Sequence, residues 1–325
     1  MKTHYLVGID VGGTKISVVL GTPKGRILFK RVIPTQTGSH TKESIRQIVA
    51  AIQESLKRFG ITAKNMKGIG IGVPGPVDPK REEIEHSPNL KGWRRVPLKH
   101  ILKKKFRCPV FIENDANAAA LGEKYFGSGR NVKDFAYITV STGVGCGMIV
   151  NHQLVRGVVG SAGEIGHVTV EHPGGRLARG KRGCLEAYAS GTAIAKRASQ
   201  LIRSRKNSRI YMIMKKEGAA KVQGWMVSQA ADQHDPFAIQ LKREAADYLG
   251  IGIGTIINLL NPKLIILGGG VMEHAQPFWK QLKQAVQRES WPYAFKKCKI
   301  IKTRLRGRVG DLGAIAVVIE RLQSN

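Results

Sequence analysis

The sequence has few cysteines, and they give no sign of a disulfide framework. The four cysteines, at positions 108, 146, 184 and 298, lie far apart and form no CxxC pair. This usage argues against a disulfide-stapled secreted scaffold and is typical of a reducing compartment. The residues before Asp10 also lack the apolar core of a signal peptide. We therefore expect a cytoplasmic protein.

Long apolar runs are missing as well. The longest uncharged run, residues 135–155, has the length of a membrane span. It contains Ser, Thr, Asn, Gln, His and several glycines, which are poor residues for a membrane helix. We therefore expect no membrane partner.

Acidic residues are scarce, and aromatic residues make up only 6% of the chain. Against 53 Lys and Arg there are 23 Asp and Glu, a net charge of +30. Such a charge attracts polyanions without regard to sequence. The basic clusters, residues 99–107, 176–182, 203–209 and 296–308, are not interleaved with the aromatics that single-strand binders use. Any nucleic-acid binding is therefore expected to be non-specific.

Two common phosphate-binding loops are absent. A Walker A loop requires GKS or GKT, and neither occurs. A Rossmann fingerprint requires glycines that open a helix, whereas the glycines after Asp10 lead into another strand. What is present instead is DVGGT (10–14) and STGVG (141–145), each between two alternating runs, and GGG (268–270) after a strand. Glycine lets backbone amides approach phosphate oxygens closely, so these three turns predict a phosphate site.

The order of the predicted elements repeats. Alternating runs at 4–11, 15–22 and 26–34 predict an antiparallel ribbon, followed by a helix at 41–60. Strands at 67–73 and 108–114 and a helix at 115–127 come next. The chain then repeats the pattern, with a ribbon at 135–151, a helix at 243–261, a strand at 263–271 and a further helix. We expect GIGIG, at 68 and again at 250, to mark close packing against a neighbouring element.

This repetition predicts two related α/β domains with a cleft between them. We expect one domain to comprise residues 1–115 plus 309–325 and the other residues 116–308. The helix at 310–322 is then expected to cross back to the first domain.

Taken together, the motifs resemble the ROK sugar kinases of the actin-like ATPase superfamily. GIDVGGTK and STGVG resemble the family's phosphate motifs, and LIILGGGV resembles its adenosine motif. ENDANAAALGE, SAGEIGH, SPNLKGW and GCLE are similar to its sugar-site motifs, in the expected order from about residue 5 to 320. The resemblance implies two actin-like (ribonuclease H-like) domains with an interdomain active-site cleft, an ATP- and Mg²⁺-dependent sugar kinase, and a homodimer. Family regulators carry a helix-turn-helix segment before this domain, which we do not expect here because the first motif starts within ten residues of Met1.

The resemblance assigns roles to particular residues. Asp115 would be the catalytic base, although an Asp where a strand meets a helix is also an ordinary N-cap. Asp10 would hold Mg²⁺ through water, with a turn-capping role as the alternative. The predicted sugar ligands are Asn89, Asn114, Asp115, Glu164, His167 and Glu186. The predicted ATP-binding residues are Asp10, Gly12, Gly13, Thr14, Lys15, Thr142, Gly143, Gly145, Gly268, Gly269 and Gly270.

The family's structural zinc is not expected in this chain. Many members bind zinc through the histidine of GEIGH and three cysteines in a CxCGxxGC loop. Aligned back from Cys184, the first two cysteine positions are Leu177 and Arg179. One thiol, His167 and at best His172 make a poor set for an ion that takes four thiolate or imidazole ligands.

The resemblance favours a glucokinase, which transfers phosphate from ATP to the 6-hydroxyl of glucose. The motifs leave fructose, mannose and N-acetylmannosamine open as substrates. An alternative of another class is a non-catalytic sugar-sensing regulator. Retention of Asp10, Asp115 and all three glycine turns argues against it, because a sensor has no need of a base.

Overall fold

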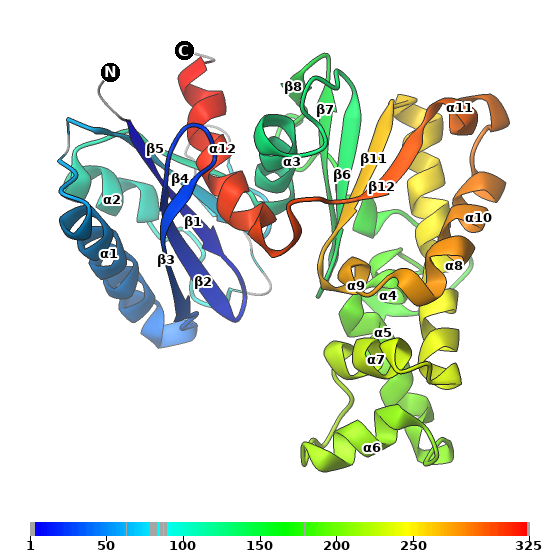
Figure 1. Cartoon of the computed structure of the whole chain (residues 1–325). Coiled ribbons are helices and arrows are strands. Elements are labelled where there is room, and N and C mark those ends of the chain that lie inside the picture. The colour runs from blue at the N-terminus through cyan, green and yellow to red at the C-terminus, as the bar shows by residue number, and fades with distance from the viewer. Residues whose placement is uncertain are drawn as a thin grey trace. The chain divides into compact units, whose positions relative to one another are not determined.

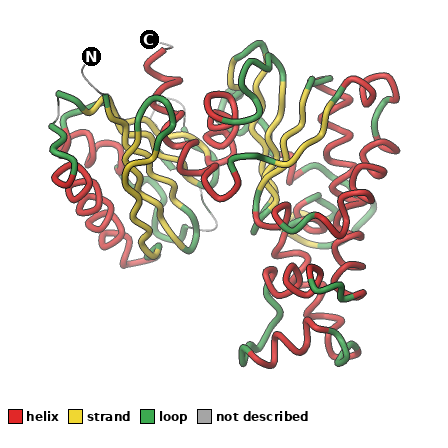
Figure 2. The backbone as a smooth tube through the Cα atoms, in the orientation of Figure 1, coloured by secondary structure: helices red, strands yellow, loops and turns green. Residues whose placement is uncertain are grey.

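The computed structural model describes residues 4–62, 64–78, 83–84, 87, 90–178 and 180–323. The chain divides into two compact units. Unit 1 comprises residues 1–132, 147–162 and 307–325, and unit 2 comprises residues 133–146 and 163–306. Both units contain helices and strands, as Figure 2 shows. No helix in the described ranges has the length and apolarity needed to cross a membrane.

Unit 1 is built on a five-stranded sheet with the strand order β3-β2-β1-β4-β5 (Figure 1). β1, β2 and β3 form an antiparallel ribbon, which confirms the prediction for residues 4–34, and β4 and β5 run parallel to β1. The strands are β1 (Tyr5–Val11), β2 (Lys15–Gly21), β3 (Ile27–Pro34), β4 (Met66–Val73) and β5 (Val110–Asn114). The helices are η1 (Gly38–His40), α1 (Thr41–Arg58), α2 (Leu98–Phe106), α3 (Asp115–Phe126), η5 (Arg306–Arg308) and α12 (Val309–Gln323).

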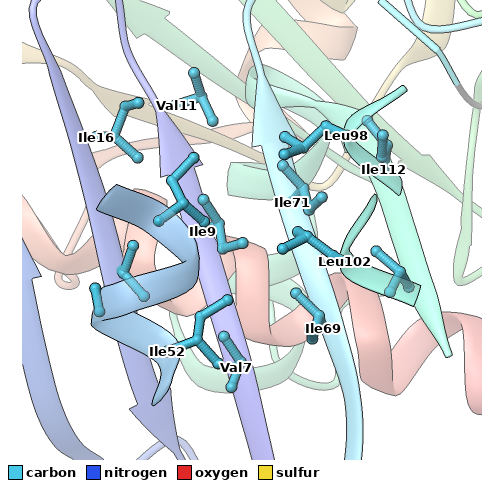
Figure 3. Close-up of a cluster of buried hydrophobic side chains, with 14 of the residues drawn as sticks. Val7, Ile9, Val11, Ile16, Ile52, Ile69, Ile71, Leu98, Leu102 and Ile112 are labelled. Carbon is cyan, nitrogen blue, oxygen red and sulfur yellow. The ribbon is translucent and has the colours of Figure 1, made fainter. Parts of the chain in front are cut away.

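Helices α1 and α2 supply the core on one face of this sheet. Figure 3 shows Ile9 of β1 and Ile71 of β4 among side chains that include Ile52 of α1 and Leu98 of α2. All four are fully buried. Since successive strand residues point to opposite faces, Asp10 lies on the other face, which is the face that α12 covers.

That opposite face is lined with glycine, which lets α12 approach the strands closely. A Cβ atom on Gly70 of β4 would lie 2.0 Å from the carbonyl oxygen of Ala314, and one on Gly8 would lie 3.1 Å from that of Asp311. On the adjoining helix α3, a Cβ on Gly122 would lie 3.0 Å from the amide nitrogen of Gly313. GIGIG at 68 is therefore a packing motif, as predicted, and the C-terminal helix belongs to unit 1.

The second sheet has the strand order β12-β11-β6-β7-β8. Its strands are β6 (Phe135–Val140), β7 (Val144–Val150), β8 (Gln153–Leu154), β11 (Leu264–Gly268) and β12 (Lys299–Lys302). A two-stranded sheet pairs β9 (Leu177–Ala178) with β10 (Lys181–Arg182). The helices of unit 2 are η2 (Ile165–His167), α4 (Glu186–Ala189), α5 (Gly191–Leu201), η3 (Ile202–Ser204), α6 (Arg209–Lys216), α7 (Gly224–Asp232), α8 (Pro236–Leu260), α9 (Gly270–Glu273), η4 (Gln276–Phe278), α10 (Trp279–Glu289) and α11 (Pro292–Lys297).

The long helix α8 repeats the glycine packing of unit 1. A Cβ on Gly250 would lie 2.4 Å from the Cβ of Ala285 on α10, and one on Gly252 would lie 2.4 Å from Leu185. The predicted helix at 243–261 was too short, because α8 begins at Pro236. Asp235 caps it by accepting a hydrogen bond from the amide of Ala238 at 2.7 Å.

The predicted domains, residues 1–115 plus 309–325 and residues 116–308, stay a prediction. The compact units place α3, residues 115–126, together with the first sheet. The reason is local packing, since α3 lies against the glycine face of α12.

We predict that Gly70→Ala lowers the free energy of unfolding by about 2 kcal/mol or more, because a methyl group there must displace the backbone of α12. Gly307→Ala is the matched control, since a Cβ at Gly307 meets no atom within 4 Å. Urea denaturation of the wild type and both variants measures the difference. Equal stability of the two variants would contradict the close approach of α12.

Candidate functional site

The first glycine turn joins β1 to β2 and is presented to solvent. The amide of Gly12 donates to the carbonyl of Lys15 at 2.9 Å, and the hydroxyl of Thr35 donates to the carbonyl of Gly12 at 2.7 Å. Gly13, Thr14 and Lys15 are exposed. The turn is thus fixed at its base, while its tip is free to meet a ligand.

Asp10 stands at the carboxyl end of β1, directly before this turn. It pairs in register with Gly72 of β4, and a Cβ added to Gly310 would lie 2.1 Å from its Oδ2. Burial raises the pKa of Asp10 to about 6, and the nearby charge of Asp311 adds to the rise, while Lys30 and Lys15 oppose it.

Asp311, in the first turn of α12, is a site residue that the sequence analysis missed. Its side chain is 3% exposed. Its Oδ1 accepts a hydrogen bond from the hydroxyl of Ser17 at 2.6 Å, and its Oδ2 accepts one from the ammonium of Lys30 at 2.6 Å. The available signal was Ser17 itself, a hydroxyl between apolar residues of a buried strand, which needs a polar partner.

Asn114 and Asp115 lie where β5 passes into α3. Asn114 is the N-cap, because its Oδ1 accepts from the amides of Ala116 at 2.9 Å and Asn117 at 3.1 Å. Its Nδ2 donates to the carbonyl of Gly75 at 3.2 Å. Asn114 is therefore the N-cap residue, and Oδ1 of Asp115 also accepts from the amide of Ala116, at 2.8 Å. Asp115 is the first helical residue, with its charge at the positive end of the helix dipole.

The buried Glu113 stabilises this junction through hydrogen bonds. It was not among the predicted site residues. It accepts from the Nε of Arg156 at 2.8 Å and from the Nδ2 of Asn117 at 3.1 Å. The hydrogen bond from Asn117 links the end of β5 to the first turn of α3, and the contact with Arg156 holds the Glu113 side chain in place. Together they fix the backbone that carries Asp115.

Unit 1 brings Asp115, the predicted base, and Asp10, the predicted magnesium ligand, to one edge of its sheet. A Cβ on Gly72 would lie 3.8 Å from Oδ1 of Asp10 and 3.9 Å from Cα of Asp115. Because β1, β4 and β5 are parallel neighbours, their carboxyl ends meet at that edge. Gly72 therefore places no side chain between the Asp10 carboxylate and the backbone of Asp115.

Unit 2 holds three of the predicted sugar ligands. Glu186, at the start of α4, is buried, and its Oε2 accepts from the amide of Val144 at 3.1 Å, where the second glycine turn ends. Glu164 directly precedes the short helix η2 and His167 is its last residue, with 3.9 Å between Glu164 Oε2 and His167 Nε2, and both side chains are partly exposed. Asn89 lies outside the described residues.

A cavity of about 1000 Å³ lies within unit 2 beside the second glycine turn. Thr142 and Gly270 line it, as two of the predicted nucleotide residues. Most of its other wall comes from the segment that contains helices α5 to α7, residues 191–232, to which no role was assigned from the sequence. This part of the wall combines three cations with two aromatic rings: Lys196, Arg203, Lys221, Tyr211 and Trp225. An apolar cavity with a few cations suits a ligand that has both a flat ring and phosphates.

The other predicted glycines serve the backbone around this cavity. Gly269 has a φ of +90°, and a Cβ on it would lie 2.4 Å from the carbonyl of Val140. A Cβ on Gly268 would lie 2.2 Å from the hydroxyl of Tyr137. The carbonyl of Gly143 accepts from the amide of Ser141 at 2.9 Å, which closes the turn that also contains Gly145.

The raised pKa of Asp10 predicts a pH-dependent stability. A carboxyl whose folded pKa exceeds its unfolded pKa stabilises the protein at low pH, and that contribution is lost as the pH rises through about 6. Asp10→Asn has no proton to lose, so it should gain stability relative to the wild type between pH 4 and pH 7. Urea denaturation at both pH values tests this, with the exposed Glu217→Gln as control. A pH-independent difference between Asp10→Asn and the wild type would contradict it.

Comparison with known proteins places the whole described site within one family. The model of the ROK family matches residues 6–321. The chain is 38% identical to a glucokinase of Halalkalibacterium halodurans over 90% of this chain and 88% of that protein. It is also 33% identical to a xylose repressor of Caldicellulosiruptor bescii, over 98% of this chain and 79% of the repressor.

Among solved structures, a glucokinase of Streptomyces griseus in complex with glucose and AMPPNP is similar throughout. The TM-score is 0.81 at 33% identity, with 96% of this chain and 98% of that chain covered.

Proposed function

The chain belongs to the ROK family and has its actin-like α/β fold, and from that premise we propose that it is an ATP-dependent sugar kinase, a glucokinase in the first instance. It would transfer the γ-phosphoryl group of ATP to the 6-hydroxyl of glucose. The observation that carries the proposal is the placing of Asp10 and Asp115 on either side of Gly72, next to a glycine turn. The similar glucokinases of Halalkalibacterium halodurans and Streptomyces griseus support it.

Asp115 is proposed as the base. Phosphoryl transfer depends on holding the hydroxyl in line with the γ-phosphate and on a carboxylate that accepts its proton as it attacks. Asp115 sits on rigid backbone, because Asn114 caps the helix and Glu113 ties its first turn to Arg156. A base held on such a frame loses little of its orientation during the reaction.

The nucleotide is assigned to both glycine turns and to the cavity of unit 2. The adenosine would occupy the cavity beside Gly270, with the cations of its wall toward the phosphates. Asp10 fits a magnesium role, since Mg²⁺ takes carboxylate oxygens and keeps several of its waters. Its raised pKa reports an uncompensated environment for negative charge, which a divalent cation would relieve. The bound Mg²⁺ would neutralise charge on the transferring phosphate.

The sugar is assigned to Asn114, Glu164, His167 and Glu186, together with Asn89. Side chains that donate and accept can discriminate between epimers, because a wrong hydroxyl leaves a polar group unpaired. Glucose is preferred on the strength of the glucokinase relatives. Kinases for fructose, mannose and N-acetylmannosamine would use the same base.

A sugar-sensing regulator is the second candidate, and the similarity to the xylose repressor favours it. It predicts sugar binding and salt-dependent retention on DNA without ADP release. The kinase hypothesis requires ADP release in the presence of sugar, so an assay of ADP release separates the kinase from the regulator.

We predict that Asp115→Asn reduces kcat with glucose and MgATP by about 10³-fold or more, since the hydroxyl loses its proton acceptor while the site keeps its shape. Glucose binding, measured by calorimetry, should change little. Asp247→Asn on α8, whose carboxylate hydrogen-bonds the side chain of Gln281, is the control and should retain wild-type kcat. Wild-type turnover in Asp115→Asn would show that another group is the base.

The nucleotide assignment makes a separate prediction about Gly270. A Cβ there meets no atom within 4 Å, and the residue lines the cavity. Gly270→Phe should therefore raise the KM for ATP by about tenfold or more by occupying the adenosine space, while the KM for glucose changes little. Gly270→Ala, which adds only a methyl group, should behave almost as the wild type. An unchanged KM for ATP in Gly270→Phe would remove the nucleotide from this cavity.

A further inference from the structure

The family resemblance implies a zinc site in the loop between Glu164 and Glu186, and the residues of this loop do not fit that ion. Zinc in structural sites takes four Cys or His ligands in a tetrahedron. Cys184 is the only thiol in the loop, it is fully buried, and its Sγ faces the carbonyl of Lys181 at 3.9 Å. The ammonium of Lys181 in turn donates to the carbonyl of His167 at 2.6 Å. Over the described part of the chain, no three His, Cys, Asp or Glu side chains are grouped as metal ligands.

We infer that a cluster of two tyrosines, an arginine and two glutamates positions this loop in place of a metal, and thereby sets the sugar affinity. The aromatic–arginine cluster consists of Glu171, Arg176, Tyr188, Glu244 and Tyr248. Its effect on the sugar rests on the proposed function, whereas its effect on the loop does not.

The centre of the cluster is a pair of stacked rings. Tyr188 of α4 and Tyr248 of α8 have ring centroids 4.0 Å apart at an interplanar angle of 30°. The guanidinium of Arg176 lies over the ring of Tyr188, 4.9 Å from its centroid, and pairs with Glu244 of α8. Stacking and cation–π contact both favour this arrangement.

Two hydrogen bonds attach the loop to these rings at separate points. The hydroxyl of Tyr188 accepts from the backbone amide of Arg176 at 2.6 Å. The hydroxyl of Tyr248 donates to the carboxylate of Glu171 at 2.7 Å. A zinc ion would hold separate segments of the loop together by binding ligands from each of them. Here the side chains of Tyr188 on α4 and Tyr248 on α8 hold separate segments of the loop.

The backbone of the loop is shaped for this contact. Gly175 has a φ of +80°, and a Cβ on it would lie 2.3 Å from the hydroxyl oxygen of Tyr188, so no side chain fits there. The two arms of the loop pair with each other, since Val170 donates to Gly183 at 2.8 Å and Thr169 bridges to Cys184. The first arm starts at His167, and the second leads directly into Glu186.

The charges of the cluster are compatible with one another. Burial raises the pKa of Tyr248 to about 12, and its bond to Glu171 adds to the rise. Hydrogen bonds from Tyr248 and Tyr188 lower the pKa of Glu171. The tyrosines therefore stay neutral and Glu171 stays ionised around pH 7. The hydrogen bond from Tyr248 to Glu171 is thus a charge-assisted one.

The test compares Tyr248→Phe, which removes one hydroxyl and keeps the ring, with Arg176→Met. Tyr293→Phe is the control, since that tyrosine is 69% exposed. Hydrogen exchange of the peptides covering 166–183 should accelerate about tenfold in both cluster variants and not in the control, because each loses a bond to a charged group. The KM for glucose should rise by a similar factor, with the KM for ATP and kcat nearly unchanged.

Metal analysis of the wild type should find far less than one zinc per chain, and a chelator should leave the exchange unchanged. One zinc per chain that a chelator removes, with faster exchange in the loop, would overturn the inference. So would wild-type exchange in both cluster variants. Faster exchange in a protein that phosphorylates no sugar would uphold the positioning of the loop and refute the proposed kinase instead.

Discussion

The close approach of α12 to β1 and β4 is the contact on which the site of unit 1 depends. Glycine at positions 8, 68 and 70 leaves no Cβ between the helix and the strands. The same approach brings the first turn of α12 over the end of β1, so that Asp311 reaches Ser17 and Lys30, and Gly310 leaves space for Asp10. A side chain at any of these glycines would move the helix, and with it the charges around Asp10.

Holding these carboxylates together costs free energy, since burial and like charge both oppose ionisation. The structure offsets part of the cost at Asp311 with a hydroxyl and an ammonium group, and it leaves Asp10 with the raised pKa. In the proposed kinase that imbalance is useful, because a cation bound at Asp10 would be attracted by the negative charge of Asp311, which helps to raise the pKa of Asp10.

Most strands, the glycine turns and several helix ends can be predicted from the sequence, because they depend on residues that are close together along the chain. Alternating apolar residues predict the ribbon of β1 to β3, and glycine turns after strands predict the phosphate motifs with Asp10. Asp235-Pro236 was also a readable helix start that the prediction of α8 missed. The junction at Asn114 and Asp115 was placed correctly, but which of the two caps the helix depends on side-chain direction, which spacing does not give.

The remaining site residues depend on contacts between distant segments. Asp311 lies 294 residues from Ser17, and Arg156 lies 43 residues from Glu113. Helices α5 to α7, which contribute to the wall of the cavity in unit 2, contain none of the glycine or sugar-site motifs. Tyr188 and Tyr248 likewise belong to no motif, and only the fold brings their rings together.

If this protein transfers a phosphoryl group to a sugar, a label in the γ-phosphate of ATP must follow that group to the sugar. Wild-type protein would be incubated with ATP labelled with ³²P in the γ-phosphate, Mg²⁺ and glucose, and the products separated. We expect label on the 6-hydroxyl of glucose, with little released as inorganic phosphate. Label that stays in ATP, or that appears only as inorganic phosphate with glucose and with the other hexoses, would contradict it.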